Sequence, residues 1–171
     1  MSNQVPALEI NTLDQAILTE IAKSPLTGYN LMKLLPVNTG WSASHQQIYR
    51  QCNKLEQSGF LEYREILNDG KPDSKEYRLT EKGKDVLREA LEKEQFKLVT
   101  FRNKSTVMLA AGAVSYFVAA TDVLDRAIQA LHKKLDGVEC PVQRLNLELE
   151  IEHKKADLFF AGRAKELLSV R

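Results

Sequence analysis

The chain has 171 residues, and its 24 lysines and arginines against 23 aspartates and glutamates leave a formal net charge of +1. This balance excludes a polybasic tail protein, an acidic solvating tail and a highly charged nucleic-acid coat. Hydrophobic residues make up 43% of the chain, with only 8 glycines and 5 prolines, which excludes a disordered or fibrous chain. The length suits one ordinary domain, or one small domain with an appendage.

Cysteine usage and the absence of apolar runs bound the compartment. Cys52 and Cys140 are far apart and show no Cys-x-x-Cys spacing, so we expect neither a disulfide scaffold nor a zinc site, and a reducing, cytoplasmic location. Residues 1–10 lack the basic start and apolar run of a secretory signal. Residues 105–121 are uncharged but contain polar side chains, so we expect a helix buried between other helices or subunits, not a membrane span.

Two short helices are predicted near the start of the chain. Residues 12–15 match a capping box, and apolar positions then recur at helical spacing over 13–23. A second helix is predicted over residues 28–35, where Pro36 would stop it.

A longer helix and a hairpin follow. Residues 44–47 form another capping box, which opens a helix that Gly59 ends. Residues 60–66 and 76–79 have strand composition, and the turn-rich stretch 68–74 between them predicts a β-hairpin.

A fourth helix is predicted from Thr80 to about Glu94. Helix, helix, helix, hairpin, helix is the order of a winged helix-turn-helix. The predicted fold class is therefore mainly α, an α+β winged helix-turn-helix with a C-terminal helical dimerisation domain. We place the DNA-binding domain at residues 1–95 and the helical, coiled-coil-like dimerisation domain at residues 96–171.

Two apolar stripes mark the C-terminal half, on either side of a break at residues 137–141. One stripe has 4-3-4 spacing, and the helix after the break is apolar on two sides. One side carries Leu147, Ile151, Leu158 and Ala161. With no sheet to cover two stripes, we expect a symmetric homodimer through helices 102–170. The predicted dimerisation residues are Leu124, Ile128, Leu131, Leu135, Leu145, Leu149, Ala156 and Phe159.

The third predicted helix separates into two faces on a helical wheel. Ile48, Cys52 and Leu55 point to the core, and the opposite face carries Gln46, Arg50, Asn53 and Gln57, with Lys54 beside them. Gln and Asn bond to adenine, Arg to guanine and Lys to phosphate. Residues 21–55 contain four cations and no acidic residue. We predict base contacts from Gln46, Gln47 and Arg50, backbone contacts from Ser44, Asn53 and Lys54, and phosphate or minor-groove contacts from Lys71 and Lys75 at the hairpin.

Several runs together resemble the PadR family of bacterial transcriptional regulators. They are Leu-Thr-Gly-Tyr-Asn-Leu at 26–31, Ser-His-Gln-Gln-Ile-Tyr-Arg at 44–50, Asn-Lys-Leu at 53–55 and Gly-Lys-Pro-Asp-Ser-Lys-Glu-Tyr-Arg-Leu-Thr at 70–80. The second run and the Gly-Lys-Pro-Asp wing are similar to the AphA-like branch of virulence regulators. The resemblance covers residues 13–95.

The resemblance implies a homodimer whose winged helices bind a palindromic operator in double-stranded DNA. It also implies that residues 43–58 are the recognition helix, that Tyr29 lies near the DNA backbone and that Lys71 and Lys75 belong to the wing. Some relatives lose DNA binding when a small phenolic acid enters a pocket between the domains, so a small-molecule effector is part of what the resemblance implies.

Other functions find less support in the residues. No nucleophile elbow, P-loop or dinucleotide fingerprint is present. Glu150, His153 and Asp157 share one helix face, which we interpret as solvated because Glu-x-x-His occurs in one copy only. We therefore expect no enzyme, metal or cofactor. Cys52 is interpreted as a small core hydrophobe, with a redox switch as the alternative, and Trp41 as an anchor of the turn before the third helix or as part of an effector pocket.

The alternative function from another class is a winged-helix protein adaptor that has lost DNA binding. The two differ in salt dependence, because a phosphate-reading dimer must lose affinity steeply as salt rises.

Overall fold

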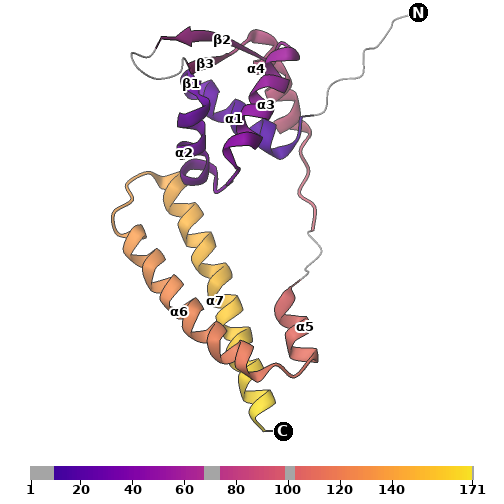
Figure 1. Cartoon of the computed structure of the whole chain (residues 1–171), viewed down its shortest axis with the longest axis vertical. Helices are drawn as coiled ribbons and strands as arrows, with labels where there is room; N and C mark the ends of the chain where they lie inside the picture. The colour runs from indigo at the N-terminus through magenta and orange to yellow at the C-terminus, as the bar shows by residue number, and fades with distance from the viewer. Residues whose placement is uncertain (1–9, 68–73, 99–102, 171) are drawn as a thin grey trace, which may run out of the picture. The chain divides into compact units, whose positions relative to one another are not determined.

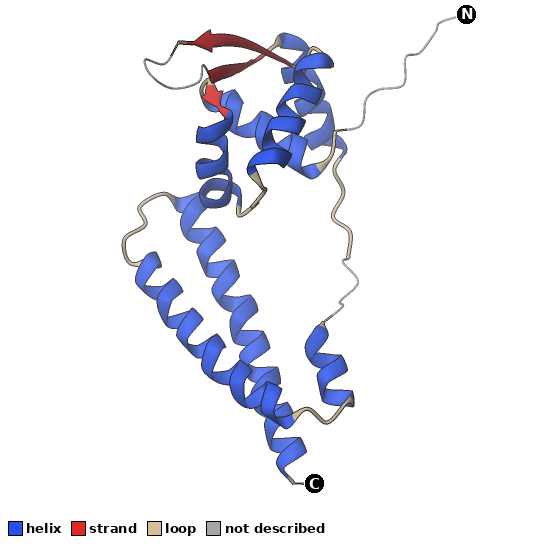
Figure 2. Cartoon of the chain, viewed as in Figure 1, coloured by secondary structure: helices blue, strands red, loops and turns tan. Residues whose placement is uncertain are grey.

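The computed structural model of the chain describes residues 10–67, 74–98 and 103–170. The chain divides into two compact units, Met1–Phe96 and Lys97–Arg171 (Figure 1). The described residues are mostly helical, with one small sheet in the first unit (Figure 2), which confirms the predicted mainly α winged-helix fold class. None of the helices within these ranges is long and apolar enough to span a membrane.

Helix α1 (Thr12–Lys23) begins one residue earlier than predicted and with a different cap. The capping box is formed by Asn11 and Asp14, not by Thr12 and Gln15. The Asn11 side-chain oxygen accepts a hydrogen bond from Asp14 N at 2.9 Å, and Asn11 N donates to Asp14 Oδ2 at 3.0 Å. Asn is a strong N-cap residue, and in this register the apolar side of α1 stays buried.

Helix α2 (Gly28–Thr39) passes through Pro36, where the sequence predicts its end. Beyond the proline, Asn38 Nδ2 donates to Glu20 Oε2 of α1 at 2.7 Å, and Thr39 Oγ1 donates to Leu35 O at 2.7 Å. The helix ends only at Gly40, whose φ of 68° is the left-handed conformation typical of a helix C-terminus. Just before α2, the two-residue strand β1 (Leu26–Thr27) is an element that the sequence did not predict.

The sheet has the strand order β1-β3-β2, and both pairings are antiparallel. Strands β2 (Leu61–Ile66) and β3 (Ser74–Leu79) are the predicted hairpin, with slightly shifted bounds. Strand β1 adds to β3 at Tyr77, which is fully buried. The turn between β2 and β3, residues 68–73, lies outside the described residues, and so does Lys71.

The backbone that follows helix α3 (His45–Gln57) packs closely against the start of helix α4 (Glu81–Lys93). Gly59 takes a φ of 72° after α3, as the sequence predicts for a helix end. Thr80 then caps α4: its hydroxyl donates to Gly59 O at 2.7 Å and accepts from Gly83 N at 3.0 Å, while Thr80 N donates to Phe60 O at 3.1 Å. These bonds hold the end of α3 against the start of α4.

One hydrophobic core serves the whole first unit. It contains buried residues from every helix of that unit and from all three strands: Ile17, Leu18, Ile21, Leu26, Leu31, Leu35, Ile48, Cys52, Leu55, Phe60, Leu61, Tyr77 and Leu87.

The second unit contains α5 (Lys104–Ala110), α6 (Val114–Leu135) and α7 (Pro141–Ser169). The single buried helix predicted across residues 105–121 is wrong. Gly112 breaks it, with a φ of 69° that favours glycine, and within this stretch only Phe117 is fully buried. The predicted break at residues 137–141 separates α6 from α7.

Helices α6 and α7 form a hairpin that covers one of the two predicted stripes within the subunit. Ile128 and Leu131 of α6 are buried against Ile151 of α7. Leu135, Leu147 and Leu158 extend this cluster, and Leu124 packs at a second one around Phe117 and Ala161. The side of α7 that carries Leu147, Ile151 and Leu158 thus covers the α6 stripe. The sequence alone did not indicate that these two stripes pack together.

The backbone junction at Gly83 generates a prediction. A Cβ on Gly83 would lie 2.1 Å from Phe60 O, which is backbone and cannot move aside. We expect Gly83→Ala to lower the free energy of unfolding by about 1–3 kcal/mol, measured by urea unfolding followed by far-UV circular dichroism. Gly162→Ala is the matched control, because Gly162 is also helical but a Cβ there meets no atom within 4 Å. The control should be neutral or gain about 0.5–1 kcal/mol; equal midpoints for both variants would contradict the account.

Candidate nucleic-acid interface

The start of α3 is fixed by the predicted capping box. Ser44 Oγ accepts from Gln47 N at 3.3 Å, and Gln47 Oε1 accepts from Ser44 N at 2.9 Å. Both side chains are exposed. The two bonds satisfy amides that an open helix end would leave unpaired, so α3 begins at a defined residue.

The predicted division of α3 into two faces is confirmed. Ile48, Cys52 and Leu55 are at most 1% exposed and belong to the core of the first unit. Gln46, Arg50, Asn53 and Gln57 are exposed. Because a helix repeats every 3.6 residues, the burial of one side dictates which side chains face outward.

The side chain of Asn53 forms a hydrogen bond with Tyr77 of strand β3. The Tyr77 hydroxyl donates to Asn53 Oδ1 at 3.4 Å. Burial, followed by the charges of neighbouring groups, raises the pKa of Tyr77 to about 12, so it remains a hydrogen-bond donor at neutral pH. With its oxygen bonded to Tyr77, Asn53 has its amide NH2 group left for an acceptor such as a phosphate oxygen.

Lys54 of α3 is engaged with α1. Its Nζ lies 3.0 Å from Asp14 Oδ2, and the Asp14 carboxylate is fully buried whereas the Lys54 side chain is 41% exposed. The ammonium that the sequence assigns to the DNA backbone is thus paired with a carboxylate on another helix.

Two of the four cations between residues 21 and 55 are neutralised from α1. Lys23 pairs with the buried Glu20 at 2.5 Å, as Lys54 does with Asp14. For Lys33 and Arg50 the described residues supply no ion pair. Lys33 Nζ lies 4.3 Å from the centroid of the Tyr29 ring, which is 51% exposed on α2. Of the four cations in this acid-free stretch, Lys33 and Arg50 thus remain without an ion pair within the described ranges, and Arg50 lies on the exposed face of α3.

The wing carries its charges along the strands. Lys75 lies opposite Glu65 in the hairpin register, and its Nζ stacks 3.7 Å above the centroid of the Tyr63 ring. Arg64 and Glu76 also pair across the strands, at 2.5 Å. Lys75 is thus positioned by the face of an aromatic ring, whereas Lys71 lies outside the described residues.

Helices α2 and α3 approach closely where Gly28 meets the Tyr49 ring. A Cβ on Gly28 would lie 2.8 Å from a ring carbon of Tyr49. The centroid of the Tyr49 ring lies 4.3 Å from that of the His45 ring. The sequence reasoning missed this contact, as it missed Asp14 and Tyr77. The last two reach α3 from 40 and 24 residues away, and no local pattern announces such pairs.

This arrangement defines a winged helix-turn-helix: a third helix with one buried and one polar face, preceded by two helices and followed by a hairpin. Residues 17–89 match the model of the transcriptional regulator PadR-like family. The chain is also 30% identical over 149 residues to the negative transcriptional regulator PadR of Bacillus subtilis, covering 82% of this chain and 79% of that protein. The chain belongs to the PadR-like family of transcriptional regulators.

Solved structures of relatives share the fold. The crystal structure of B. subtilis PadR in complex with operator DNA matches with a TM-score of 0.80 at 23% identity, over 92% of this chain and 99% of that one. The structure of B. subtilis PadR in complex with p-coumaric acid matches with a TM-score of 0.70 at 23% identity, over 94% and 99%.

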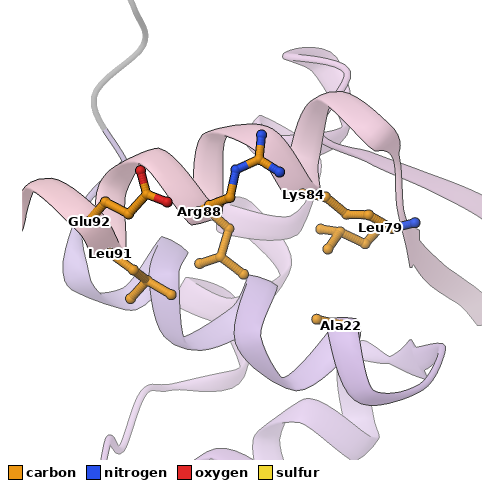
Figure 3. Close-up of a pocket in the computed structure, with 7 residues that line it drawn as sticks. Ala22, Leu79, Lys84, Arg88, Leu91 and Glu92 are labelled. Atoms are coloured by element: carbon orange, nitrogen blue, oxygen red, sulfur yellow. The ribbon is translucent and has the colours of Figure 1, made fainter.

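A groove of about 440 Å³ in the first unit is lined by residues of α1, β3 and α4 (Figure 3). Ala22 of α1, Leu79 of β3 and two leucines of α4 form its apolar surface. Lys84, Arg88 and Glu92 of α4 lie along it, and the first two pair with acidic residues of their own helix. None of the predicted DNA-contact residues lines this groove.

The two cysteines differ in exposure and in chemistry. Cys52 is buried, and burial, with a smaller contribution from the nearby Asp14 carboxylate, raises its pKa to about 12. Cys140 is exposed at the start of α7. Since the thiolate is the reactive form, the structure favours the core role of Cys52 over the redox switch.

This difference generates a prediction for thiol reactivity. A chromogenic disulfide reagent at mildly alkaline pH should modify one thiol per native chain and both thiols after denaturation. In Cys140→Ser the native chain should react with none. Rapid modification of Cys52 in the native Cys140→Ser variant would contradict its assignment to the core.

Proposed function

We propose that this chain is a transcriptional regulator that binds an inverted-repeat operator in double-stranded DNA as a homodimer. The observation that carries the proposal is the exposed polar face of α3, which offers Gln46 and Arg50 near the start of a helix whose other side is buried. In a helix-turn-helix this part of the recognition helix enters the major groove. The membership of the PadR-like family, and the complex of B. subtilis PadR with operator DNA, support the proposal.

Each contact follows from the chemistry of the side chain. In the proposed complex Arg50 bonds to guanine and Gln46 to adenine, because these side chains make bidentate contacts with those base edges. Gln47 keeps its Oε1 atom in the capping box, so it offers a base edge its Nε2 amide as a donor. The other proposed contacts are with the DNA backbone: Ser44 and Asn53 from α3, Tyr29 from α2, and Lys71 and Lys75 from the wing.

The proposed dimer interface lies on α7. The α6 residues of the predicted interface are covered by α7 itself, whereas Leu145, Leu149 and Phe159 are 66%, 56% and 73% exposed. Val142 and Ala156 share this face, and the stripe has the spacing of a two-helix seam. Such an exposed apolar stripe marks an interaction site, and a second copy presenting the same stripe is its simplest cover.

The remaining parts of the proposal are finer. We assign DNA binding to residues 1–95 and dimerisation to residues 96–171, and place the chain in the AphA-like branch on the runs at 44–50 and 70–73. A small-molecule effector belongs to the proposal because B. subtilis PadR has been solved with p-coumaric acid. We also propose a cytoplasmic regulator without enzymatic activity. Among the described residues, no group of three or more His, Cys, Asp or Glu could hold a metal ion.

The DNA contact of Arg50 is directly testable. Arg50→Ala should weaken binding to the DNA flanking the chain's own gene by about 1–3 kcal/mol and relax the preference at one base pair, measured by fluorescence anisotropy. Gln57→Ala is the matched control, since Gln57 is exposed at the far end of the same helix and should change little. Affinity should also fall steeply with salt. No binding by wild-type protein at low salt would refute the regulator function and leave the adaptor.

The dimer interface predicts a change of mass. Leu149→Asp would bury a carboxylate against apolar side chains of the partner, so we expect monomers in analytical ultracentrifugation. Lys155→Asp introduces the same side chain on the polar flank of α7, where Lys155 is exposed and pairs with Glu152, and should leave the dimer intact. An unchanged mass for Leu149→Asp would remove α7 from the interface.

A further inference from the structure

Asp14 is a buried carboxylate whose role in the core is not explained by packing. It lies on the first turn of α1 with no exposed surface. Its Oδ2 atom accepts from Asn11 N and from Lys54 Nζ, both at 3.0 Å. Its Oδ1 atom has no hydrogen-bond partner among the described residues.

Burying a carboxylate with one oxygen unpaired costs free energy. We therefore ask which interaction of Asp14 a neutral side chain could not make. Closing the cap at Asn11 requires one acceptor atom, which a neutral side chain supplies. A carboxylate adds a negative charge whose desolvation must be offset by a cation. Within the described residues the cation paired with Asp14 is Lys54 of α3.

We propose that Asp14 is a positioning residue for the recognition helix, which holds Lys54 against α1 and withholds its charge from DNA. The inference rests on the proposed function, and it replaces the phosphate contact that the sequence assigns to Lys54. Arg50, one turn earlier on the same helix, is then the side chain through which α3 offers a positive charge to DNA.

Among the described residues, side chains of α3 receive two polar contacts from other elements, and the Asp14–Lys54 pair is one of them. Lys54 reaches α1, and the adjacent Asn53 receives a hydrogen bond from the buried Tyr77 of β3. Both contacts lie in the second half of α3. They leave Gln46 and Arg50 in the first half, where the helix meets the groove in the proposed complex.

The salt dependence of DNA binding separates the two roles of Lys54. The probe is a fluorescently labelled duplex from the DNA flanking the chain's own gene. Removing one phosphate contact lowers the slope of log affinity against log salt by about 0.9. We expect Lys54→Gln to keep the wild-type slope. Lys75→Gln, which removes a proposed phosphate contact from the wing, is the matched charge control and should lower it. A slope for Lys54→Gln reduced as much as that of Lys75→Gln would overturn the inference.

A double-mutant cycle tests the anchor without DNA. Asp14→Asn and Lys54→Gln should each lower the urea midpoint of unfolding, and the double variant should be no less stable than the less stable single variant. Lys54→Arg keeps the positive charge, so its urea midpoint of unfolding should stay close to that of the wild-type protein. Additive effects of the two substitutions would show that the residues do not act as a pair and would refute the anchor.

The two measurements also separate this inference from the proposed function. If wild-type protein binds no DNA at low salt, the regulator function fails, and the cycle still decides whether Asp14 holds Lys54. If wild-type protein binds and Lys54→Gln loses slope, the regulator function stands and the inference fails.

Discussion

The packing of one side of α3 into the first unit is the constraint on which the proposed function depends. Ile48, Cys52 and Leu55 are buried among residues from every other helix and all strands of that unit. Burial of their apolar surface contributes about 1.5–3 kcal/mol of stabilising free energy for each large side chain. This contribution fixes which side of the helix faces the core. With that rotation fixed, the side chains of Gln46 and Arg50 face the solvent, where the proposed base contacts can form.

Buried carboxylates on α1 shape the charge of this surface. In the sequence, residues 21–55 look uniformly basic because no acidic residue falls among them. In the fold, Asp14 and Glu20 lie beneath them and pair with Lys54 and Lys23. The positive charge left on this surface is consequently small, in keeping with a chain whose net charge is only +1. In the proposed complex, such a surface contributes little affinity that is independent of sequence, so operator choice rests on base contacts and on the geometry of the proposed dimer.

Local patterns predicted most of the first unit. The capping box at Ser44 and Gln47 and the left-handed glycine after α3 are short-range devices, and a single sequence shows them. Strand β1 is two residues long and exists only because β3 pairs with it, so it has no period to detect. The extension of α2 beyond Pro36 includes Asn38, whose side chain donates to Glu20 of α1, and no local pattern shows such a tertiary contact.

Long-range pairing explains what the sequence could not show at the candidate site. A helical wheel identified the polar face of α3, but the partners of Asn53 and Lys54 come from β3 and α1. Periodicity assigns the apolar stripe of α6 to the interface with a partner subunit, whereas in the structure α7 of the same chain covers it. Periodicity alone does not distinguish these two covers. The stripe on α7 stays exposed, and it is the part for which we propose a partner subunit.

Footprinting on the DNA flanking the chain's own gene tests the central claim most directly, because it reports both the groove contact and the symmetry. We expect protection of two inverted half-sites whose centres lie about one helical turn, or a multiple of it, apart, with protected major-groove guanines in each. Absence of protection at low salt, or one protected half-site without a symmetric partner, would contradict it.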